Sequence, residues 1–464
     1  MLFTSYTFLF LFLPLVVLAH HFAPTRLRNP VLLLASYIFY AWWRVDFVLL
    51  LAASAIIDYS CGHRIHAAQS AAAKRRFLLL SIVTNLSLLS YFKYANWGID
   101  NLSGLLEAFG GSAIPWAEVV LPVGISFFTF QTMSYSIDVY RGDAEPASSL
   151  LDFSTYVAMF PQLVAGPIVR YRTVAAQLAQ RHRDPQLFAR GTLLFMVGFS
   201  KKILLANNCG LVADAVFDPG PTGFFAAWIG LAAYTFQIYF DFSGYSDMAI
   251  GLGNMFGFHY PRNFDSPYRA QSITEFWRRW HITLTTWIRD YLYIPLGGNR
   301  GGPRKTYRNL ALAMVLCGLW HGASWTFVLW GAYHATLLIA ERVRGREPVY
   351  ARLPGFLRVA CTMVLVMIGW LIFRSETLES FSNYGWMLVD PSTVDVGSLS
   401  YQLVQPLTYV VLGVCALITY LGRESITLVS AARPRTYLLF FVLFGWSTVE
   451  LLSQEYNPFL YFQF

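Results

Sequence analysis

Residues 224–258 read FFAAWIGLAAYTFQIYFDFSGYSDMAIGLGNMFGF. An apolar stretch of this length is long enough to cross a lipid bilayer, because about 20 helical residues span its hydrocarbon core. Two carboxylates, Asp241 and Asp247, lie inside the stretch. Ionisable side chains at membrane depth are expensive, so each is expected to be paired or functional. The stretch therefore predicts a membrane helix whose polar side faces the protein interior.

The composition of the whole chain also indicates a lipid environment. Of its 464 residues, 56% are hydrophobic and 13% are charged, whereas soluble proteins average roughly 45–50% and about 25%. The net charge of +8 does not predict nucleic-acid binding, because the basic residues gather in short loops between apolar runs. The five cysteines form no CxxC pair, so neither disulfides nor a metal site are expected.

Apolar stretches are distributed along the entire chain. They cover residues 2–19, 31–59, 77–92, 119–140, 187–216, 222–256, 309–341, 357–373, 406–421 and 436–452. Several of them divide, for example at a tight turn over 42–46, so that about eleven crossings are predicted in a single membrane domain, 1–464. The first stretch is interpreted as a retained span because no basic residue precedes it; a leader cleaved near Ala19 is the alternative.

The distribution of lysine and arginine predicts the orientation, since basic loops stay in the cytoplasm. The basic loops are 20–29, 62–76, 141–190, 258–308, 342–358 and 422–435. Loop 95–118 has acidic residues and no basic one, and loop 375–405 resembles it. Both are expected to face outward, which places the N- and C-termini outside as well.

Two segments do not have the pattern of ordinary spans. Residues 150–173 are apolar but are broken by Pro161, Gly166 and Pro167, so we expect a re-entrant segment that does not cross. Residues 272–297 carry too many charges to face lipid. They are expected to lie in the membrane interface or to fold inward.

Three groups of polar residues could carry chemistry. In the first, helical spacing places Gln237, Asp241 and Tyr245 on one stripe, at i, i+4 and i+8. A stripe of this kind faces the protein interior. The structural alternative is that Asp241 and Asp247 pair with arginines of segment 262–289 and only hold the fold together.

The second group lies in residues 276–290, FWRRWHITLTTWIRD. If this segment is one helix, Arg278, His281, Thr285 and Arg289 share a face. Guanidinium groups bind phosphate oxygens in a bidentate manner, so this face could hold a cytoplasmic cofactor. Alternatively, the arginines follow the positive-inside bias and pair with Asp241, Asp247 or Asp290.

The third group lies in residues 318–325, GLWHGASW. Gly322 can end a helix directly after His321 and open the backbone to a cavity. An imidazole can remove the proton of a hydroxyl that attacks a thioester. The alternative is a hydrogen-bonded packing histidine. His334 lies roughly 20 Å further along a continuous helix, so the two are not expected to act together.

The run over residues 271–321, QSITEFWRRWHITLTTWIRDYLYIPLGGNRGGPRKTYRNLALAMVLCGLWH, resembles the signature of the membrane-bound O-acyltransferase family. The similarity is strongest to its bacterial polysaccharide branch, the membrane subunits of alginate O-acetylation. It extends over essentially the whole chain, with further support at 36–47, 91–96, 121–127, 239–253 and 457–464.

The resemblance implies an all-α polytopic protein of the bacterial inner membrane. Its helices would form a ring around a thin centre, with a funnel from the cytoplasm to His321. Residues 320–322 match the family's WHG motif, whose histidine is essential, and His281 corresponds to its second polar position. The expected lining of the funnel or donor site consists of Trp320, Arg278, Arg279, Thr285, Arg289, Gln237, Asp241 and Tyr245.

The resemblance also implies a function. Acetyl groups would pass from a cytoplasmic thioester, acetyl-CoA, across the membrane to an exported polysaccharide, with alginate favoured over cellulose, peptidoglycan or teichoic acid. No bound cofactor is expected. Periplasmic serine-type acetyltransferases would finish the transfer, docking near 95–118, 375–405 or 458–462.

A rival from another functional class is a secondary transporter or lipid-linked sugar flippase that uses Asp241, Asp247 and arginines as a charge relay. Folds of that class often contain paired broken helices in two related halves. The broken segment 150–173 has no counterpart in the C-terminal half of the sequence, which disfavours this reading.

Overall fold

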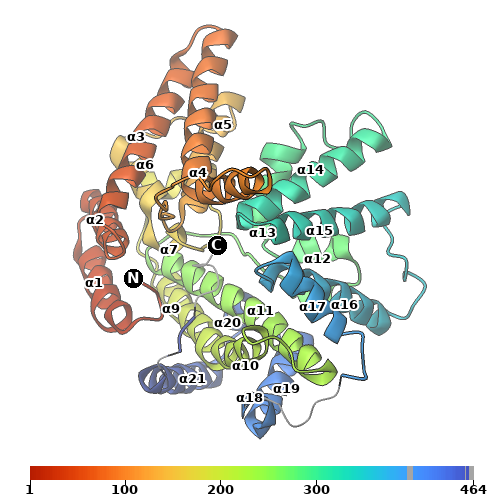
Figure 1. The fold of residues 1–464 in the computed structure, drawn as a ribbon. Helices are drawn as coiled ribbons and strands as arrows, with labels where there is room; N and C mark the ends of the chain where they lie inside the picture. The colour runs from red at the N-terminus through yellow and green to blue at the C-terminus, as the bar shows by residue number, and fades with distance from the viewer. Residues whose placement is uncertain (394–400, 455, 459–464) are drawn as a thin grey trace. The chain divides into compact units, whose positions relative to one another are not determined.

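The computed structural model describes residues 1–393, 401–454 and 456–458. Within these ranges, every regular element is a helix (Figure 1). The all-α prediction is therefore confirmed for the described part of the chain. Residues 394–400 of loop 375–405 and residues 459–462 of the predicted docking terminus lie outside the described residues.

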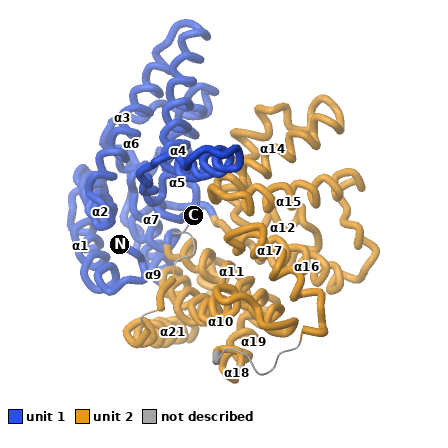
Figure 2. Tube along the Cα trace, in the orientation of Figure 1, with its two compact units in different colours: residues 1–192, 249–261 blue, residues 193–248, 262–464 orange. Residues whose placement is uncertain are grey.

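The chain forms two compact units (Figure 2). Unit 1 contains Met1–Thr192 and Ala249–Pro261, and unit 2 contains Leu193–Met248 and Arg262–Phe464. Two helices, α9 (Pro185–Ser200) and α11 (Phe224–Met255), contribute residues to both units. The single membrane domain over 1–464 stays a prediction.

Unit 1 is built around α5 (Ile125–Arg141), which is buried from Ile125 through Val139. Left-handed glycines, Gly124 and Gly142, bound this helix at its two ends. The helices of unit 1 besides α5 and α9 are η1 (Phe8–Phe12), α1 (Leu13–Phe22), η2 (Thr25–Leu27), α2 (Arg28–Ala41), α3 (Asp46–Ala67), α4 (Ala71–Ala108), α6 (Leu150–Ala158), α7 (Phe160–Leu163) and α8 (Tyr171–Ala179). The predicted turn over 42–46 is confirmed between α2 and α3.

Residues 150–173 of unit 1 are divided into short helices and a non-helical run, as the prolines and the glycine in this segment predict. Short helices α6 and α7 are followed by a non-helical run over 164–170, and nearly all of these residues are buried. Protein side chains bond to its backbone: Tyr156 Oη donates to Val169 O at 2.9 Å, and Phe160 N donates to Ser36 Oγ at 3.0 Å. With nine residues, α6 is about 14 Å long and too short to cross a bilayer. Its re-entry into a membrane stays a prediction.

Unit 2 carries the remaining helices. After α9 they are η3 (Lys201–Ala206), α10 (Asn207–Phe217), α11, η4 (Pro267–Arg269), α12 (Ile273–Arg279), α13 (Ile282–Ile288), η5 (Arg289–Tyr293), α14 (Pro303–His321), α15 (Trp325–Val343), α16 (Gly355–Arg374), α17 (Leu378–Met387), α18 (Tyr401–Val404), α19 (Pro406–Leu421), α20 (Ser425–Ser430) and α21 (Pro434–Ser453). The helix α15 packs against both α14 and α16.

Two glycines allow α14 and α15 to approach closely. A β-carbon on Gly318 would lie 2.2 Å from the carbonyl oxygen of Phe327, and one on Gly331 would lie 2.5 Å from that of Met314. Both obstacles are backbone atoms, which cannot move aside as a flexible side chain would. The close pairing of these helices fixes the end of α14, where His321 lies.

Replacement of Gly331 by alanine is expected to destabilise the protein by about 1–3 kcal/mol, because the added methyl group overpacks the α14–α15 contact. The thermal unfolding midpoint of the purified protein in detergent measures this effect. Gly104→Ala is the matched control, since Gly104 also lies within a helix and nothing lies within 4 Å of its β-carbon position. Equal midpoints for the two variants would contradict the proposed close contact.

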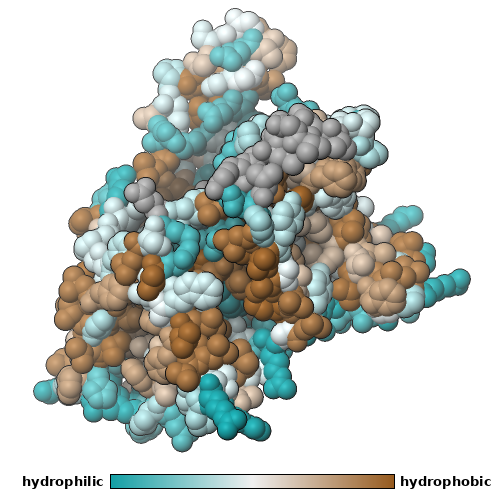
Figure 3. Space-filling view, turned by 90° about the horizontal axis from the view of Figure 1, so that it is seen from below, coloured by the Kyte–Doolittle hydropathy of each residue, from teal (hydrophilic) through white to brown (hydrophobic). Residues whose placement is uncertain are grey.

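Four helices in the described residues, α3, α4, α16 and α21, are long and apolar enough to cross a membrane. The predicted count of about eleven crossings is therefore not confirmed. Several predicted stretches divide into shorter elements: 187–216 becomes α9, η3 and α10, and 309–341 divides at Gly322. Hydrophobic residues cover much of the face seen in Figure 3, as expected for a protein that contacts lipid.

The predicted outward loop 95–118 is partly wrong, because α4 continues through Ala108. Its 38 residues correspond to about 57 Å of helix, nearly twice the hydrocarbon thickness of a bilayer. Hydropathy alone locates the apolar part at 77–92 and does not report how far the helix extends beyond it. The membrane orientation of both termini stays a prediction.

Candidate active site

The histidine of the WHG motif is the last residue of α14, and the predicted helix break at Gly322 is confirmed. Gly322 has extended backbone angles (φ −161°, ψ 155°). A β-carbon at this position would lie 2.0 Å from the ring of Phe327, so only glycine leaves room for that ring. The His321 side chain is buried, with 4% of the residue exposed.

Aromatic rings surround His321. The ring centroids of Trp320, Trp330 and Phe373 lie 5.0, 5.2 and 5.3 Å from that of His321, each in an edge-to-face arrangement. These three side chains come from α14, α15 and α16. We call this group the aromatic box. It holds the imidazole in one position and limits the access of water to it.

His281 lies beside the aromatic box. Its ring centroid is 6.5 Å from that of His321 and 6.1 Å from that of Trp320. The ring of Phe242 packs edge-on against His281 at 4.6 Å. The structure therefore brings together the two histidines that the sequence singled out, although they are 40 positions apart.

The expectation of one continuous helix over this segment is wrong. Helix α12 ends at Arg279 and α13 begins at Ile282, with His281 between them in a left-handed conformation (φ 42°, ψ 55°). A β-carbon makes this conformation uncommon and strained, so surrounding contacts must hold it. His281 is fully buried and does not share an exposed face with Arg278.

Asn263 accepts hydrogen bonds that stabilise the break between α12 and α13. Its carbonyl oxygen accepts a hydrogen bond from Ile282 N at 2.9 Å. Its side-chain Oδ1 accepts bonds from Thr283 N and Thr283 Oγ1, at 3.2 and 2.9 Å. The segment before α12 thus takes the place of the helical hydrogen bonds that a continuous helix would make.

The polar stripe of α11 is buried as predicted, but its ion partners differ from the prediction. Asp241 pairs with Lys202 at 2.7 Å, and Asp247 pairs with Lys201 at 2.8 Å. Both carboxylates are therefore paired, as the structural alternative held, but these partners are lysines of η3 and not the arginines of 262–289 that it named. The lysines reach α11 because Gly198 lies against Gly244: a β-carbon on Gly198 would be 2.5 Å from the carbonyl oxygen of Gly244.

The remaining stripe residues lie on the same helix. Gln237 and Tyr245 are both buried, with 2% and 4% exposed. A β-carbon on Gly210 would lie 2.7 Å from Gln237 Nε2, so this amide packs against α10. Phe242, which follows Asp241 in the sequence, is the α11 residue seen against His281.

Two of the arginines in the predicted donor site form ion pairs with nearby acidic residues. Arg279 pairs with Glu275 at 2.7 Å, and Arg289 pairs with Asp290 at 2.6 Å. The hydrogen bond from Arg289 to Asp290 raises the pKa of that guanidinium. Arg289 thus makes the pairing with Asp290 that the structural alternative named, and its role in donor binding stays a prediction. Thr285 Oγ1 donates to Trp280 O at 3.4 Å and supports the break before α13.

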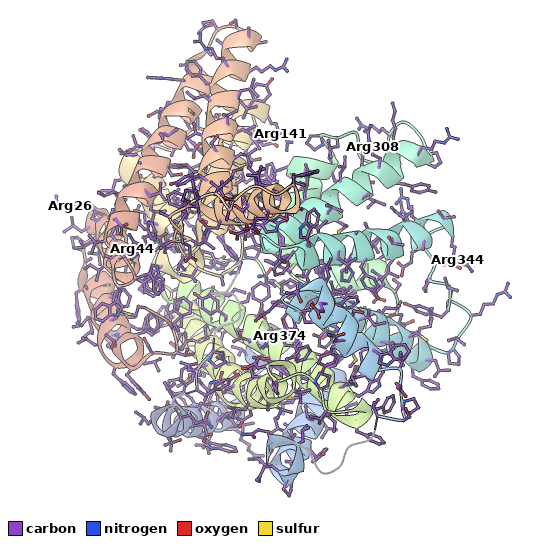
Figure 4. All side chains as sticks on the ribbon, in the orientation of Figure 1. Arg26, Arg44, Arg141, Arg308, Arg344 and Arg374 are labelled. Atoms are coloured by element: carbon purple, nitrogen blue, oxygen red, sulfur yellow. The ribbon has the colours of Figure 1, made fainter. Side chains whose placement is uncertain are left out.

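Arg278 lines a basic cavity of about 220 Å³ together with Arg342 and Arg346. Its other lining residues are Thr274, Leu310 and Leu338. We call this the arginine cavity. Figure 4 shows that Arg308 and Arg344 lie at the same end of the α14–α15 pair, which carries a basic rim. The sequence indicated Arg342 and Arg346 only as part of a basic loop.

The arginine cavity and the aromatic box lie along the same helices. Leu310 precedes His321 by 11 positions, which is about 16 Å along α14. Arg278 precedes His281 by three positions. The two sites therefore share α14 and the segment that contains α12.

The expectation that one continuous helix separates His334 from His321 by roughly 20 Å is wrong, because the helix breaks at Gly322 and both rings pack against Trp330. His334 also has partners of its own. Its Nδ1 accepts a hydrogen bond from Trp277 Nε1 at 3.3 Å, and its ring lies 4.9 Å from that of Trp330. A β-carbon on Gly369 would approach His334 Nε2 to 2.8 Å, which shows how tightly the ring is packed. These contacts are those of a hydrogen-bonded packing histidine.

A sequence profile of the membrane-bound O-acyltransferase family matches residues 128–373, which include both His281 and His321. The chain belongs to this family. Membership in this family establishes the chain as an O-acyltransferase. The apolar helices α3, α4, α16 and α21 are consistent with a protein that is bound to a membrane.

Curated relatives of this family cover the chain to different extents. A probable alginate O-acetylase of Azotobacter vinelandii is 45% identical, with 100% of both chains aligned. A peptidoglycan O-acetyltransferase of Helicobacter pylori is 37% identical over 82% of this chain and 78% of the relative. A teichoic acid D-alanyltransferase of Streptococcus thermophilus is 30% identical over 47% and 56%.

Proposed function

We propose that this O-acyltransferase moves acetyl groups from cytoplasmic acetyl-CoA across the bacterial inner membrane for the O-acetylation of alginate. The observation that carries the proposal is that the aromatic box surrounds His321 and that His281 lies next to it. The alginate assignment is supported by 45% identity over the full length of a relative named as a probable alginate O-acetylase. Matches to the peptidoglycan and teichoic acid enzymes are lower and shorter.

His321 acts as the general base in this proposal. Its imidazole takes the proton of an acceptor hydroxyl as the hydroxyl oxygen attacks the acetyl carbonyl carbon. The new C–O ester bond forms, the C–S bond of the thioester breaks, and the coenzyme A thiolate receives a proton on leaving. His281 positions the reacting groups against His321, because its left-handed backbone directs the buried ring toward the aromatic box.

The arginine cavity is the proposed site for the phosphates of acetyl-CoA. Guanidinium groups bind phosphate oxygens with paired hydrogen bonds, and Arg278, Arg342 and Arg346 converge there.

Arg342→Gln is expected to raise the KM for acetyl-CoA roughly tenfold with a smaller change in kcat, because a charge-assisted contact to a remote part of the donor is lost. Steady-state kinetics in membranes measure the two constants.

Arg352→Gln is the matched control for this experiment. Arg352 lies in the same basic loop, is exposed, and does not line the arginine cavity. The KM of the Arg352→Gln variant for acetyl-CoA is expected to match that of the unsubstituted protein. A similar rise in KM for both variants would indicate general electrostatic attraction and would contradict a specific phosphate site.

A second protein is expected to complete the transfer. Neither loop 95–118 nor loop 375–405 contains a histidine, so these predicted outward segments cannot form a Ser-His-Asp site by themselves. Periplasmic serine-type acetyltransferases would receive the acetyl group. The end of α4 is a suitable docking surface, because Leu105 and Phe109 are exposed there. In this orientation both termini are periplasmic.

Reconstitution tests this requirement. Proteoliposomes with controlled orientation would contain acetyl-CoA outside and alginate inside. We expect no acetylated polymer with this chain alone, and acetylated polymer once a periplasmic serine-type acetyltransferase is enclosed. Acetylated alginate formed by this chain as the only protein would contradict the need for a partner.

A further inference from the structure

A second basic pocket lies in unit 1, far in sequence from the histidines. Its volume is about 440 Å³. It lies between the turn that precedes α2 and the loop that follows α8, and it is lined by Ala23, Pro24, Thr25, Arg28, Arg181, His182 and Arg183. None of these described lining residues is acidic. We call it the unit 1 pocket.

The arginines of the unit 1 pocket are bound to neutral acceptors. Arg28 Nη1 donates to Arg181 O at 2.8 Å, and Arg181 Nη2 donates to Asn29 Oδ1 at 2.7 Å. Arg183 Nη2 donates to the carbonyl oxygens of His21 and Ala23. Asp152 reaches this network through Asn29, whose Nδ2 donates to Asp152 Oδ1 at 2.5 Å. These contacts fix the guanidinium groups without neutralising their charge.

Two of the three arginines are buried. Only 7% of Arg28 and 8% of Arg181 are exposed, and within the described structure the Nε atom of each has no hydrogen-bond partner. Burial, and next the charge of Arg28, lower the pKa of Arg181 to about 10. Buried cations that repel one another are unfavourable unless an anion accompanies them. The pocket is therefore preorganised for a negatively charged ligand.

We propose that the unit 1 pocket binds a phosphate group and that the group belongs to the headgroup of an anionic phospholipid. Converging guanidinium groups match the oxygens of a phosphate in geometry and charge. The pocket is flanked by exposed apolar side chains, Leu18 and Phe22 on α1 and Leu27 before α2. Acyl chains would cover these side chains, whereas a soluble phosphate would leave them exposed.

Lipid binding by the purified full-length chain tests the proposal. Phosphatidylglycerol or phosphatidylcholine is added to the protein in a neutral detergent, and native mass spectrometry measures the bound lipid. Phosphatidylglycerol is expected to bind more tightly. Arg183→Gln should weaken it roughly tenfold, because one charge-assisted contact is lost. Arg183 is exposed, so this variant keeps the fold even if Arg181→Gln does not.

Arg26→Gln is the matched control. Arg26 is exposed in the same turn, does not line the pocket, and lies at the edge of unit 1 in Figure 4. Its affinity for phosphatidylglycerol should match that of the unsubstituted protein. Equal weakening by Arg26→Gln and Arg183→Gln, or equal binding of the two lipids, would overturn the proposal. Inorganic phosphate is the third probe: if it binds as tightly as phosphatidylglycerol in the same measurement, the lipid source is overturned.

Discussion

His321→Ala is expected to lower acetyl transfer by at least about 100-fold, the range that loss of a general base produces. The abundance of the variant in the membrane should stay near that of the unsubstituted protein. His321 lies at the end of α14, where its ring packs against Trp330 and Phe373. Acetyl content of the exported polymer, together with immunoblotting of the membrane fraction, measures both quantities.

Two other histidines provide the comparison. His281→Ala should reduce transfer less completely, and His281→Asn should retain more of the backbone geometry, because asparagine tolerates the left-handed conformation better than alanine. His334→Ala should affect transfer least, since His334 packs against Trp277 and Trp330. Normal acetylation by His321→Ala, or a larger loss with His334→Ala, would contradict the assigned roles.

Lys202→Met is expected to produce the largest loss of stability, about 3–5 kcal/mol, because it removes the buried cation that pairs with Asp241. The two side chains are 3% and 2% exposed and lie 2.7 Å apart. The double variant Lys202→Met/Asp241→Leu should recover much of the loss, since no unpaired charge is then buried. Thermal unfolding of each variant in detergent measures the differences.

The exposed pair of Arg44 and Asp46 is the control for the buried one. Their nitrogen and oxygen are 2.5 Å apart, yet 44% and 54% of the side chains are exposed. Arg44→Gln should leave the unfolding midpoint unchanged, because solvent screens the pair. If Lys202→Met were as stable as Arg44→Gln, the buried pair could not be a major determinant of the fold.

Local sequence signals predicted the parts of the fold that depend on neighbouring residues. The turn over 42–46, the broken segment after α6 and the end of α14 at Gly322 all follow from glycine, proline or charged residues within a few positions. The extent of α4 did not follow, because helix ends beyond an apolar core depend on weak propensities. For the same reason, hydropathy did not establish the number of spans.

Pairing across the chain was harder to predict. Lys201 and Lys202 stand together inside the apolar stretch 187–216, a signal that could have identified them as partners of Asp247 and Asp241. Their approach depends on the contact of Gly198 with Gly244, which joins two separate helices. Arg342 and Arg346 similarly meet Arg278 only after α12, α14 and α15 have packed. Such contacts are not encoded in any single window of sequence.

The most direct test follows labelled acetyl groups from acetyl-CoA into alginate in proteoliposomes that contain the purified chain and a periplasmic serine-type acetyltransferase. The unsubstituted chain should transfer label to the polymer. His321→Ala should retain its affinity for acetyl-CoA, because the arginine cavity is separated from His321 by about 16 Å of helix, yet transfer no label above background. Transfer at the unsubstituted rate by His321→Ala would contradict the account.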